Sequence, residues 1–270
     1  LCRKRSTFGQ SNPLAGGGPG QPSVCDLPNQ KGRQFPRMVR TGDRPPAPAQ
    51  RLAITSGHPS PQAITTAVSI LRQGGLVAFP TDTLYALGAD ASNTLAVRRV
   101  FAAKGRRLAN PIPLLVGDLA MAIRITGDLP DSVARLVERY WPGPLTLLVA
   151  APPGVSPLLT AGTGRIGLRV PDAPVALDLI RRLGRPVTGT SANRSAGREP
   201  RDADEVYRQL GHRVDLILDG GPVPIGSPST VVDVTVSPPR IVREGVLRRH
   251  AVLSLLTTRS RSPRAGPGVR

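Results

Sequence analysis

The feature that most constrains this chain is a regular alternation of short apolar runs with amphipathic segments between residues 61 and 243. The runs at 76–79, 145–150 and 166–170 have the length and composition of buried strands. Several of the segments between them repeat apolar residues at helical spacing. Strands that alternate with helices predict an α/β fold on a twisted sheet that is mixed or mostly parallel, with flanking helices.

Residues 76–116 place two polar loops beside two of the predicted strands. The first loop, 80–90, is rich in turn residues and hydroxyls, and an amphipathic helix follows it. This helix ends in the cationic sequence 104–107, after which Asn110 and Pro111 lead into the second strand. The apolar residues of this predicted helix are Leu95, Val97, Val100 and Phe101.

The remaining predicted elements continue the alternation. Ser60 and Pro61 are typical of a helix start, and Gly74 and Gly75 of a helix end. Further helices are predicted at 118–123, 131–140, 173–183 and 203–210. Further strands are predicted at 186–188, 214–218, 231–234 and 240–243.

Lys104 is the only lysine of the predicted domain. The chain has 36 Lys plus Arg, but its other two lysines, Lys4 and Lys31, lie near the N-terminus. Because a compact ammonium and a guanidinium are not interchangeable where a point charge meets a phosphate oxygen, this position indicates an anion site. The alternative is a solvated helix end, where the helix dipole favours a cation.

Composition divides the chain into three parts. Residues 1–58 are basic, rich in Pro and Gly and poor in apolar periodicity, so we expect them to be disordered. Residues 59–250 are expected to form the domain, and 251–270 a second disordered, basic end. The net charge of +18 suits contact with a polyanion, and a basic RNA-binding arm is the alternative for the N-terminal part.

Several function classes are excluded or disfavoured. Cys2 and Cys25 both precede the predicted domain, which therefore has no cysteine nucleophile, thiolate metal site or disulfide. The three histidines are not spaced as a ligand pair, which disfavours zinc chemistry and a Ser-His-Asp triad. No apolar run approaches the roughly 18 residues of a membrane span, and no secretory signal is recognisable. We expect a cytoplasmic protein without membrane contact.

Two glycine-containing loops bear on nucleotide binding. Residues 162–167 match G-x-G-x-x-G, but a loop precedes them and a strand follows, so the dinucleotide motif is rejected. No P-loop sequence is present. The loop at 189–193 has small residues that let amides and hydroxyls approach a ligand, with an ordinary Ser/Asn turn as the alternative.

Together these residues resemble the YrdC-type family, the L-threonylcarbamoyladenylate synthases that begin threonylcarbamoyladenosine synthesis on tRNA. The resemblance covers residues 61–247. Any one motif would be weak, but six occur in the family's order: FPTDTLYALG, KGR followed by Asn110 and Pro111, WPGPLT, LRVP, SAN, and STVVD followed by Arg243.

The resemblance implies a sheet around a large basic cavity that holds ATP with Mg²⁺, L-threonine and bicarbonate. The implied reaction begins when the threonine amine captures bicarbonate or CO₂ as a carbamate. A carbamate oxygen then displaces pyrophosphate from the ATP α-phosphate to give threonylcarbamoyl-AMP. Adenylyl transfer requires the protein mainly to position the reactants and to neutralise charge, which is consistent with a site that has no Cys or His.

The resemblance also implies roles for individual residues. The implied threonine contacts are Thr83, Arg169 and Ser229, with the Arg169 guanidinium on the carboxylate. The implied ATP contacts are Lys104, Arg106, Asn110, Ser191, Asn193 and Arg243. Lys104 and Arg106 would be the catalytic pair at the phosphates, and no protein ligand is assigned to the metal. A turn hydroxyl is the alternative for Thr83, and a surface charge for Arg169.

Four positions depart from the family's usual residues. Ala86 replaces a Gly, and Leu115 stands where many members have a His that contacts threonine. Arg165 replaces a commoner Thr four residues before Arg169, a change that could alter nucleotide contacts, and Pro228 replaces a Glu before STVVD. None of these changes removes the cationic set.

Two other functions remain open at this point. One is a non-catalytic module that binds double-stranded RNA or tRNA through shape and charge, because aromatic residues for base stacking are few. The other is carbamoyl transfer in hydrogenase maturation, which the lack of Cys in the domain disfavours. For the synthase, the short sequence after residue 247 predicts transfer of the intermediate to a separate transferase complex.

Overall fold

The computed structural model describes residues 48–55, 59–127, 129 and 133–257, which belong to one compact unit, Arg44–Arg270. Its helices are α1 (Pro61–Arg72), α2 (Thr94–Lys104), α3 (Leu119–Thr126), α4 (Ala134–Tyr140), α5 (Pro157–Thr160), α6 (Pro174–Leu183), α7 (Ala203–Leu210) and α8 (Arg249–Thr257). None of the helices in this described part combines the length and apolar character that crossing a bilayer requires.

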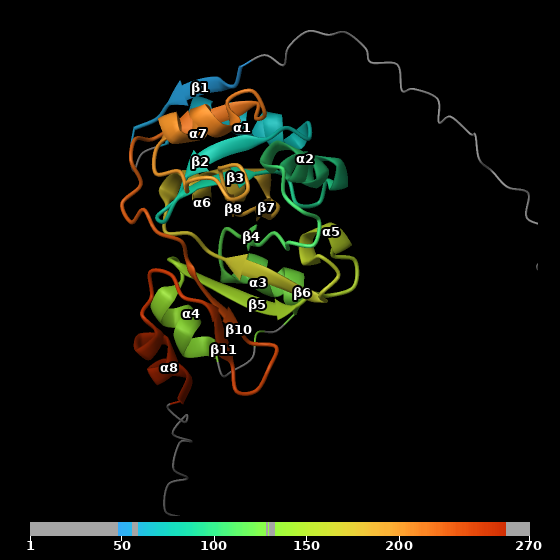
Figure 1. Cartoon of the computed structure of the whole chain (residues 1–270), viewed down its shortest axis with the longest axis vertical. Helices are drawn as coiled ribbons and strands as arrows, with labels where there is room; N and C mark the ends of the chain where they lie inside the picture. Colours follow the sequence, from blue (N-terminus) through green and yellow to red (C-terminus); the bar gives the residue numbers. More distant parts are fainter. Residues whose placement is uncertain (1–47, 56–58, 128, 130–132, 258–270) are drawn as a thin grey trace, which may run out of the picture. The chain divides into compact units, whose positions relative to one another are not determined.

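The strands form two mixed sheets (Figure 1). The first sheet has the order β1-β9-β2-β3-β8, from β1 (Gln50–Ala53), β2 (Val77–Pro80), β3 (Tyr85–Gly88), β8 (Thr190–Ser191) and β9 (Leu216–Asp219). The second has the order β11-β10-β5-β6-β4-β7, from β4 (Leu114–Leu115), β5 (Leu145–Ala150), β6 (Arg165–Arg169), β7 (Val187–Thr188), β10 (Thr230–Asp233) and β11 (Arg240–Arg243). The predicted α/β class is confirmed, in a form that has two sheets.

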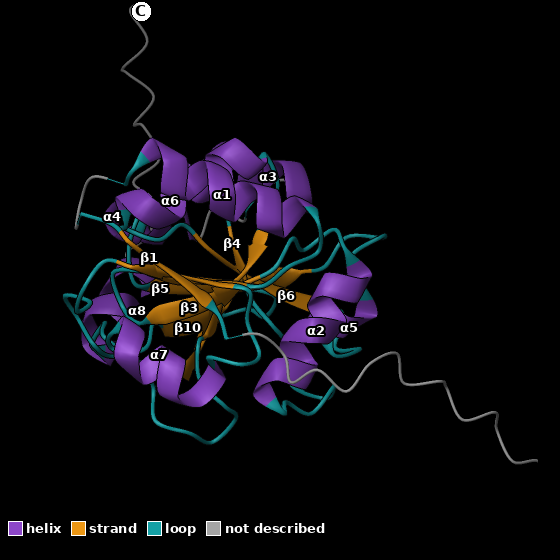
Figure 2. Ribbon diagram, turned by 90° about the horizontal axis from the view of Figure 1, so that it is seen from above, coloured by secondary structure: helices purple, strands orange, loops and turns teal. Residues whose placement is uncertain are grey.

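The helices cover the strands with the apolar faces that the sequence predicts. Helix α1 begins at Pro61 and buries Ala63, Ile64, Ala67, Val68 and Leu71. Helix α6 packs against α1 and buries its own apolar face on β2. Seen from above in Figure 2, α1, α3 and α6 lie along one side of the strands and α7 lies on the other.

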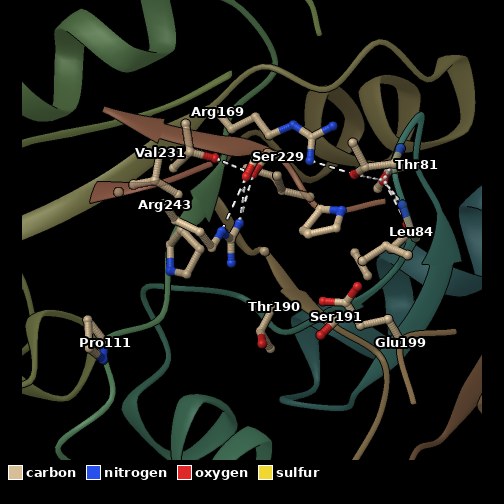
Figure 3. Close-up of a pocket in the computed structure, with 18 of the residues that line it drawn as sticks. Thr81, Leu84, Pro111, Arg169, Thr190, Ser191, Glu199, Ser229, Val231 and Arg243 are labelled. Carbon is tan, nitrogen blue, oxygen red and sulfur yellow. Dashed lines mark hydrogen bonds between the residues drawn. The ribbon is translucent and has the colours of Figure 1, made fainter. Parts of the chain in front are cut away.

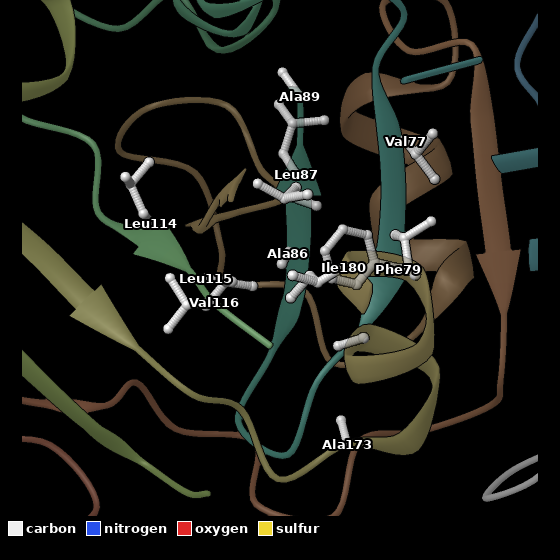
Figure 4. Packing of buried hydrophobic residues seen from close by; sticks show 14 of the residues in the cluster. Val77, Phe79, Ala86, Leu87, Ala89, Leu114, Leu115, Val116, Ala173 and Ile180 are labelled. Atoms are coloured by element: carbon white, nitrogen blue, oxygen red, sulfur yellow. The ribbon is translucent and has the colours of Figure 1, made fainter. Parts of the chain in front are cut away.

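The hydrophobic core is continuous between the two sheets. Figure 4 shows buried side chains extending from Phe79 on β2 and Leu87 on β3 to Leu115 on β4. Ile180 of α6 joins the same cluster and is fully buried. Burial of such side chains contributes about 1.5–3 kcal/mol each, so the core fixes the two sheets together.

The chain passes from one sheet to the other at Gly189. Strand β7 of the second sheet ends at Thr188, and β8 of the first sheet begins at Thr190. A Cβ atom on Gly189 would lie 2.7 Å from Cγ of Leu115. A side chain at this crossing therefore cannot coexist with Leu115 in its present position.

Three predicted boundaries are wrong. Residues 1–58 do not all lack structure, since Gln50–Ala53 form β1 parallel to β9, and the predicted tail 251–270 overlaps helix α8, which extends to Thr257. The predicted loop 80–90 contains strand β3. Residues 1–47, 56–58 and 258–270 lie outside the described residues.

The missed strand β1 depends on partners distant in the sequence. Its backbone pairs with β9, and the Arg51 guanidinium binds the carboxylates of Asp204 and Asp219.

Leu95 was predicted to be one of the apolar residues of the amphipathic helix that becomes α2. It is 73% exposed and does not belong to the buried face of that helix.

We predict that Gly189→Ala lowers the free energy of unfolding by about 1–3 kcal/mol, because the new methyl group overlaps Leu115. Urea denaturation measures the change. In a Leu115→Ala background the same substitution is expected to cost clearly less, since the clashing side chain is gone. Equal costs in both backgrounds would contradict the proposed close contact.

Candidate functional site

A cavity of about 520 Å³ lies where the two sheets meet. Its lining comes from β3 and β8 of the first sheet and from β4, β5, β6, β10 and β11 of the second (Figure 3). This volume is typical of small-molecule sites. All the residues that the resemblance singled out line this cavity: Thr83, Lys104, Arg106, Asn110, Arg169, Ser191, Asn193, Ser229 and Arg243.

Lys104 connects the end of α2 to the loop after β8. Its Nζ donates to the backbone oxygens of Ser191 and Asn193, the latter at 2.6 Å, and to Oδ1 of Asn193 at 3.2 Å. Its backbone oxygen accepts from the amide of Ser195 at 2.8 Å. Lys104 is 2% exposed, so the alternative of a solvated helix end is wrong. Burial and the nearby Arg106 charge lower the pKa of Lys104 to about 7.

The same loop is held by its own side chains. Ser191 Oγ donates to Asn193 Oδ1 at 2.6 Å, and Asn193 Nδ2 donates to the Gly197 oxygen at 2.7 Å. With the Lys104 ammonium, these bonds fix the polar groups of the loop at the cavity wall. The loop therefore has the internal hydrogen bonds of a Ser/Asn turn and also lines the cavity.

Arg169 is a buried cation with a buried partner. Its Nη2 donates to Oδ1 of Asp82, its Nη1 to Oγ1 of Thr83 at 2.7 Å, and its Nε to the Gly143 oxygen at 2.9 Å. The side chains of Arg169 and Asp82 are only 8% and 6% exposed. Burial lowers the pKa of Arg169, and the Asp82 charge opposes that shift. Arg169 is therefore not a surface charge.

Arg106 and Arg243 are each held through only part of the guanidinium. Arg106 donates to the Asn110 and Pro111 oxygens, and Arg243 donates twice to the Ser229 oxygen and once to its Oγ. Among the described residues, Nη1 of neither arginine makes a hydrogen bond. Burial lowers the pKa of both, and the Arg243 charge lowers that of Arg106 further.

The cavity carries an excess of positive charge. Its lining contains Lys104, Arg106, Arg169 and Arg243, against one carboxylate, that of Glu199. Arg169 alone among the four is paired directly with an acid. Lys104 is buried and Arg106 is partly buried, and cations in such places without an acidic partner are unfavourable unless an anion binds. Together with the more exposed Arg243 they suit a polyanion such as a polyphosphate. The paired Arg169 suits a smaller carboxylate.

Hydroxyl groups stand beside the arginines. Thr83 Oγ1 accepts from Arg169 and lies 3.1 Å from Thr81 Oγ1. Ser229 Oγ accepts from Arg243 and lies 2.9 Å from Thr146 Oγ1. Thr81 is the true turn hydroxyl, because it accepts from the amides of Thr83 and Leu84.

Three of the four departures from the family lie in the cavity lining: Ala86, Leu115 and Pro228. Arg165 does not line it, since its guanidinium pairs with Asp233 at 2.7 Å. Arg165 thus stands outside the set of residues that line the cavity, to which the implied nucleotide contacts belong.

Asp82 and Glu199 are site residues that sequence reasoning missed. Asp82 lies within the FPTDTLYALG motif, yet nothing local showed that it pairs with Arg169, 87 residues away. Its Oδ2 is buried and has no hydrogen-bond partner in the described part of the chain. Glu199 gave no signal, because a single Glu in a polar loop is normally a solvated charge.

The donor set is compatible with a magnesium ion that arrives with phosphates. Among the described residues, no group of three or more His, Cys, Asp or Glu could hold a metal by itself. Mg²⁺ prefers oxygen ligands and often takes only one or two carboxylates beside substrate phosphates. The Glu199 carboxylate and the hydroxyls of the cavity lining meet that need.

Fold and site together define a class: an α/β protein with a cation-lined cavity of small-molecule size between two sheets. The family model for Sua5, YciO and YrdC, described as "Telomere recombination", matches residues 69–245. The chain belongs to this family.

Named relatives agree with this assignment. The chain is 39% identical over 194 residues to threonylcarbamoyl-AMP synthase of Bacillus subtilis, covering 72% of this chain and 56% of that protein. It is 37% identical over 195 residues to the putative threonylcarbamoyl-AMP synthase of Mycobacterium tuberculosis, covering 72% and 89%. It thus spans about half the length of the first of these relatives and most of the second.

A solved structure shows the same fold. The structure of Pyrococcus abyssi Sua5 complexed with L-threonine superposes with a TM-score of 0.74 at 34% identity, covering 77% of this chain and 61% of that one. The resemblance inferred from the six motifs is therefore confirmed at the level of family and fold.

We predict that the Lys104 side chain titrates with a midpoint near pH 7, because burial favours its neutral form. The chain has only three lysines, so NMR of isotopically labelled lysine gives few signals. Loss of one signal in Lys104→Met assigns it. A Lys104 midpoint above about pH 9, closer to the reference value, would contradict the prediction.

We also predict that Asp82→Asn lowers the free energy of unfolding by about 3 kcal/mol, since it leaves the buried Arg169 guanidinium without its counter-charge. The double variant Asp82→Asn/Arg169→Gln is expected to lose less than the sum of the two single variants. Chemical denaturation of the four proteins measures this coupling, and strict additivity would show that the pair does not interact.

Proposed function

We propose that this chain makes L-threonylcarbamoyl-AMP from L-threonine, bicarbonate or CO₂, and ATP, with release of pyrophosphate. The observation that carries the proposal is the convergence of unpaired Lys104, Arg106 and Arg243 with the acid-paired Arg169 in one cavity. Family membership and the names of the relatives support it.

The amino acid would bind on the Arg169 side. The Arg169 guanidinium uses one hydrogen on each Nη for Asp82 and Thr83, which leaves one on each for a carboxylate. The hydroxyls of Thr83 and Ser229 would accept or donate to the bound threonine. Because Arg169 is buried and already oriented, little ordering would accompany binding.

The nucleotide would bind on the side of the unpaired cations. Nη1 of Arg106 and Nη1 of Arg243 would donate to the phosphates. Lys104 would supply a nearby charge and hold the Ser191–Asn193 loop, since its ammonium hydrogens already go to that loop. Asn110 and the side chains of the same loop would complete the ATP contacts.

The chemistry would proceed in two steps. The neutral amine of threonine attacks CO₂, forming an N–C bond and losing a proton to give a carbamate. A carbamate oxygen then attacks the α-phosphorus, and the bond from that phosphorus to the bridging oxygen of pyrophosphate breaks. The cations would stabilise the charge that moves onto the leaving pyrophosphate, which is the main task of a protein in phosphoryl-type transfer. Mg²⁺ would share that charge neutralisation.

The setting would be tRNA modification in the cytoplasm. The product is a mixed anhydride, which water hydrolyses, so a second enzyme must accept it promptly. We propose a separate transferase complex that moves the threonylcarbamoyl group to tRNA. Direct binding of tRNA or double-stranded RNA by the basic chain is the competing function.

The purified chain with ATP, Mg²⁺ and bicarbonate is expected to release pyrophosphate when L-threonine is added, and much less with L-serine or no amino acid. Lys104→Ala and Arg106→Ala are expected to lower the rate by about 100-fold or more, as loss of one charge-stabilising group does in other enzymes. A coupled pyrophosphate assay measures the rate.

Arg98→Ala is the matched control, because Arg98 is an exposed arginine of α2 that does not line the cavity. Its rate should equal that of the wild type. Absence of threonine-dependent pyrophosphate release, together with salt-sensitive RNA binding, would overturn the synthase and favour the binding module.

A further inference from the structure

Glu199 places a negative charge in a cavity otherwise lined by cations. It is the one carboxylate of the lining, and Figure 3 shows it directed into the cavity on the same side as Ser191. In the part of the chain that the structure describes, its carboxylate makes no hydrogen bond and no ion pair. Glu199 is exposed, so it is available to a ligand.

The Glu199 charge acts on cations that are proposed to bind the phosphates. Burial lowers the pKa values of Lys104 and Arg243, and the Glu199 charge raises both. The charges that act on Arg169 are those of Asp82 and Arg243 instead. The Glu199 charge therefore acts on two of the cations proposed for the nucleotide, and it lines the cavity on the side of Ser191, another proposed nucleotide contact.

A free carboxylate at this place would oppose the proposed function, because it repels the phosphates of ATP. A divalent cation between the two removes the repulsion and makes the carboxylate a favourable contact. Mg²⁺ is commonly bound in this way, by one carboxylate together with substrate phosphates and water. A contact with the threonine ammonium would instead require Glu199 to lie beside Arg169.

We propose that Glu199 is the protein's own ligand to the Mg²⁺ that accompanies ATP. This inference rests on the proposed function. It assigns to one side chain a task that no motif of the sequence indicated, and it explains why an acid is kept among the phosphate-binding cations. The remaining magnesium ligands would be phosphate oxygens and water.

The test is ATP binding by the full chain, measured by calorimetry with Mg²⁺ and, separately, with EDTA, in the absence of threonine. In Mg²⁺, Glu199→Gln is expected to bind ATP about tenfold more weakly than the wild type, since one metal ligand is lost. In EDTA the same variant is expected to bind more tightly, since the repulsion is gone. The effect of the substitution thus reverses sign with the metal.

Glu138→Gln is the matched control, because it removes the same charge from an exposed position on α4 that does not line the cavity. Its affinities should match the wild type in both conditions. Tighter binding by Glu199→Gln in both conditions would overturn the proposal and make Glu199 a purely repulsive charge, and equal affinities would also overturn it. Failure of the wild type to bind ATP in either condition would instead contradict the proposed function itself.

Discussion

The site depends on the buried ammonium of Lys104. It joins α2 to the loop after β8, two segments almost ninety positions apart in the chain, by hydrogen bonds to Ser191 and Asn193. Because its hydrogens go to protein oxygens, this ammonium holds the two segments together and also supplies a positive charge. Its burial has an electrostatic cost, and a bound polyanion would offset it. Structure and ligand affinity therefore depend on the same group.

The two cationic regions of the cavity differ in how their charge is balanced. Arg169 has an internal counter-charge in Asp82, so a single carboxylate suffices to complete its surroundings. The Arg243 charge lowers the pKa of Arg106, and neither guanidinium has an acid in direct contact among the described residues. This difference separates a place for a monoanion from a place for a polyanion, as the proposed binding of threonine and ATP in one cavity would require.

Much of this architecture was predictable from the sequence, because apolar periodicity and turn residues are local signals. Strand β5 and helix α7 have the predicted bounds, and the cavity brings together the implied site residues. What the sequence did not show was pairing between distant segments. The strand β1, the Asp82–Arg169 pair and the position of Glu199 all depend on partners that only the fold supplies.

The strand β1 has a practical consequence for any shortened form of this protein. A fragment that begins at residue 59, where the first helix signal occurs, would lack Gln50–Ala53 and so leave one edge of β9 unpaired. Open strand edges invite pairing between copies. Asp204 and Asp219 would also lose Arg51, leaving two carboxylates close together without their shared cation. We therefore expect such a fragment to self-associate while it still keeps the cavity.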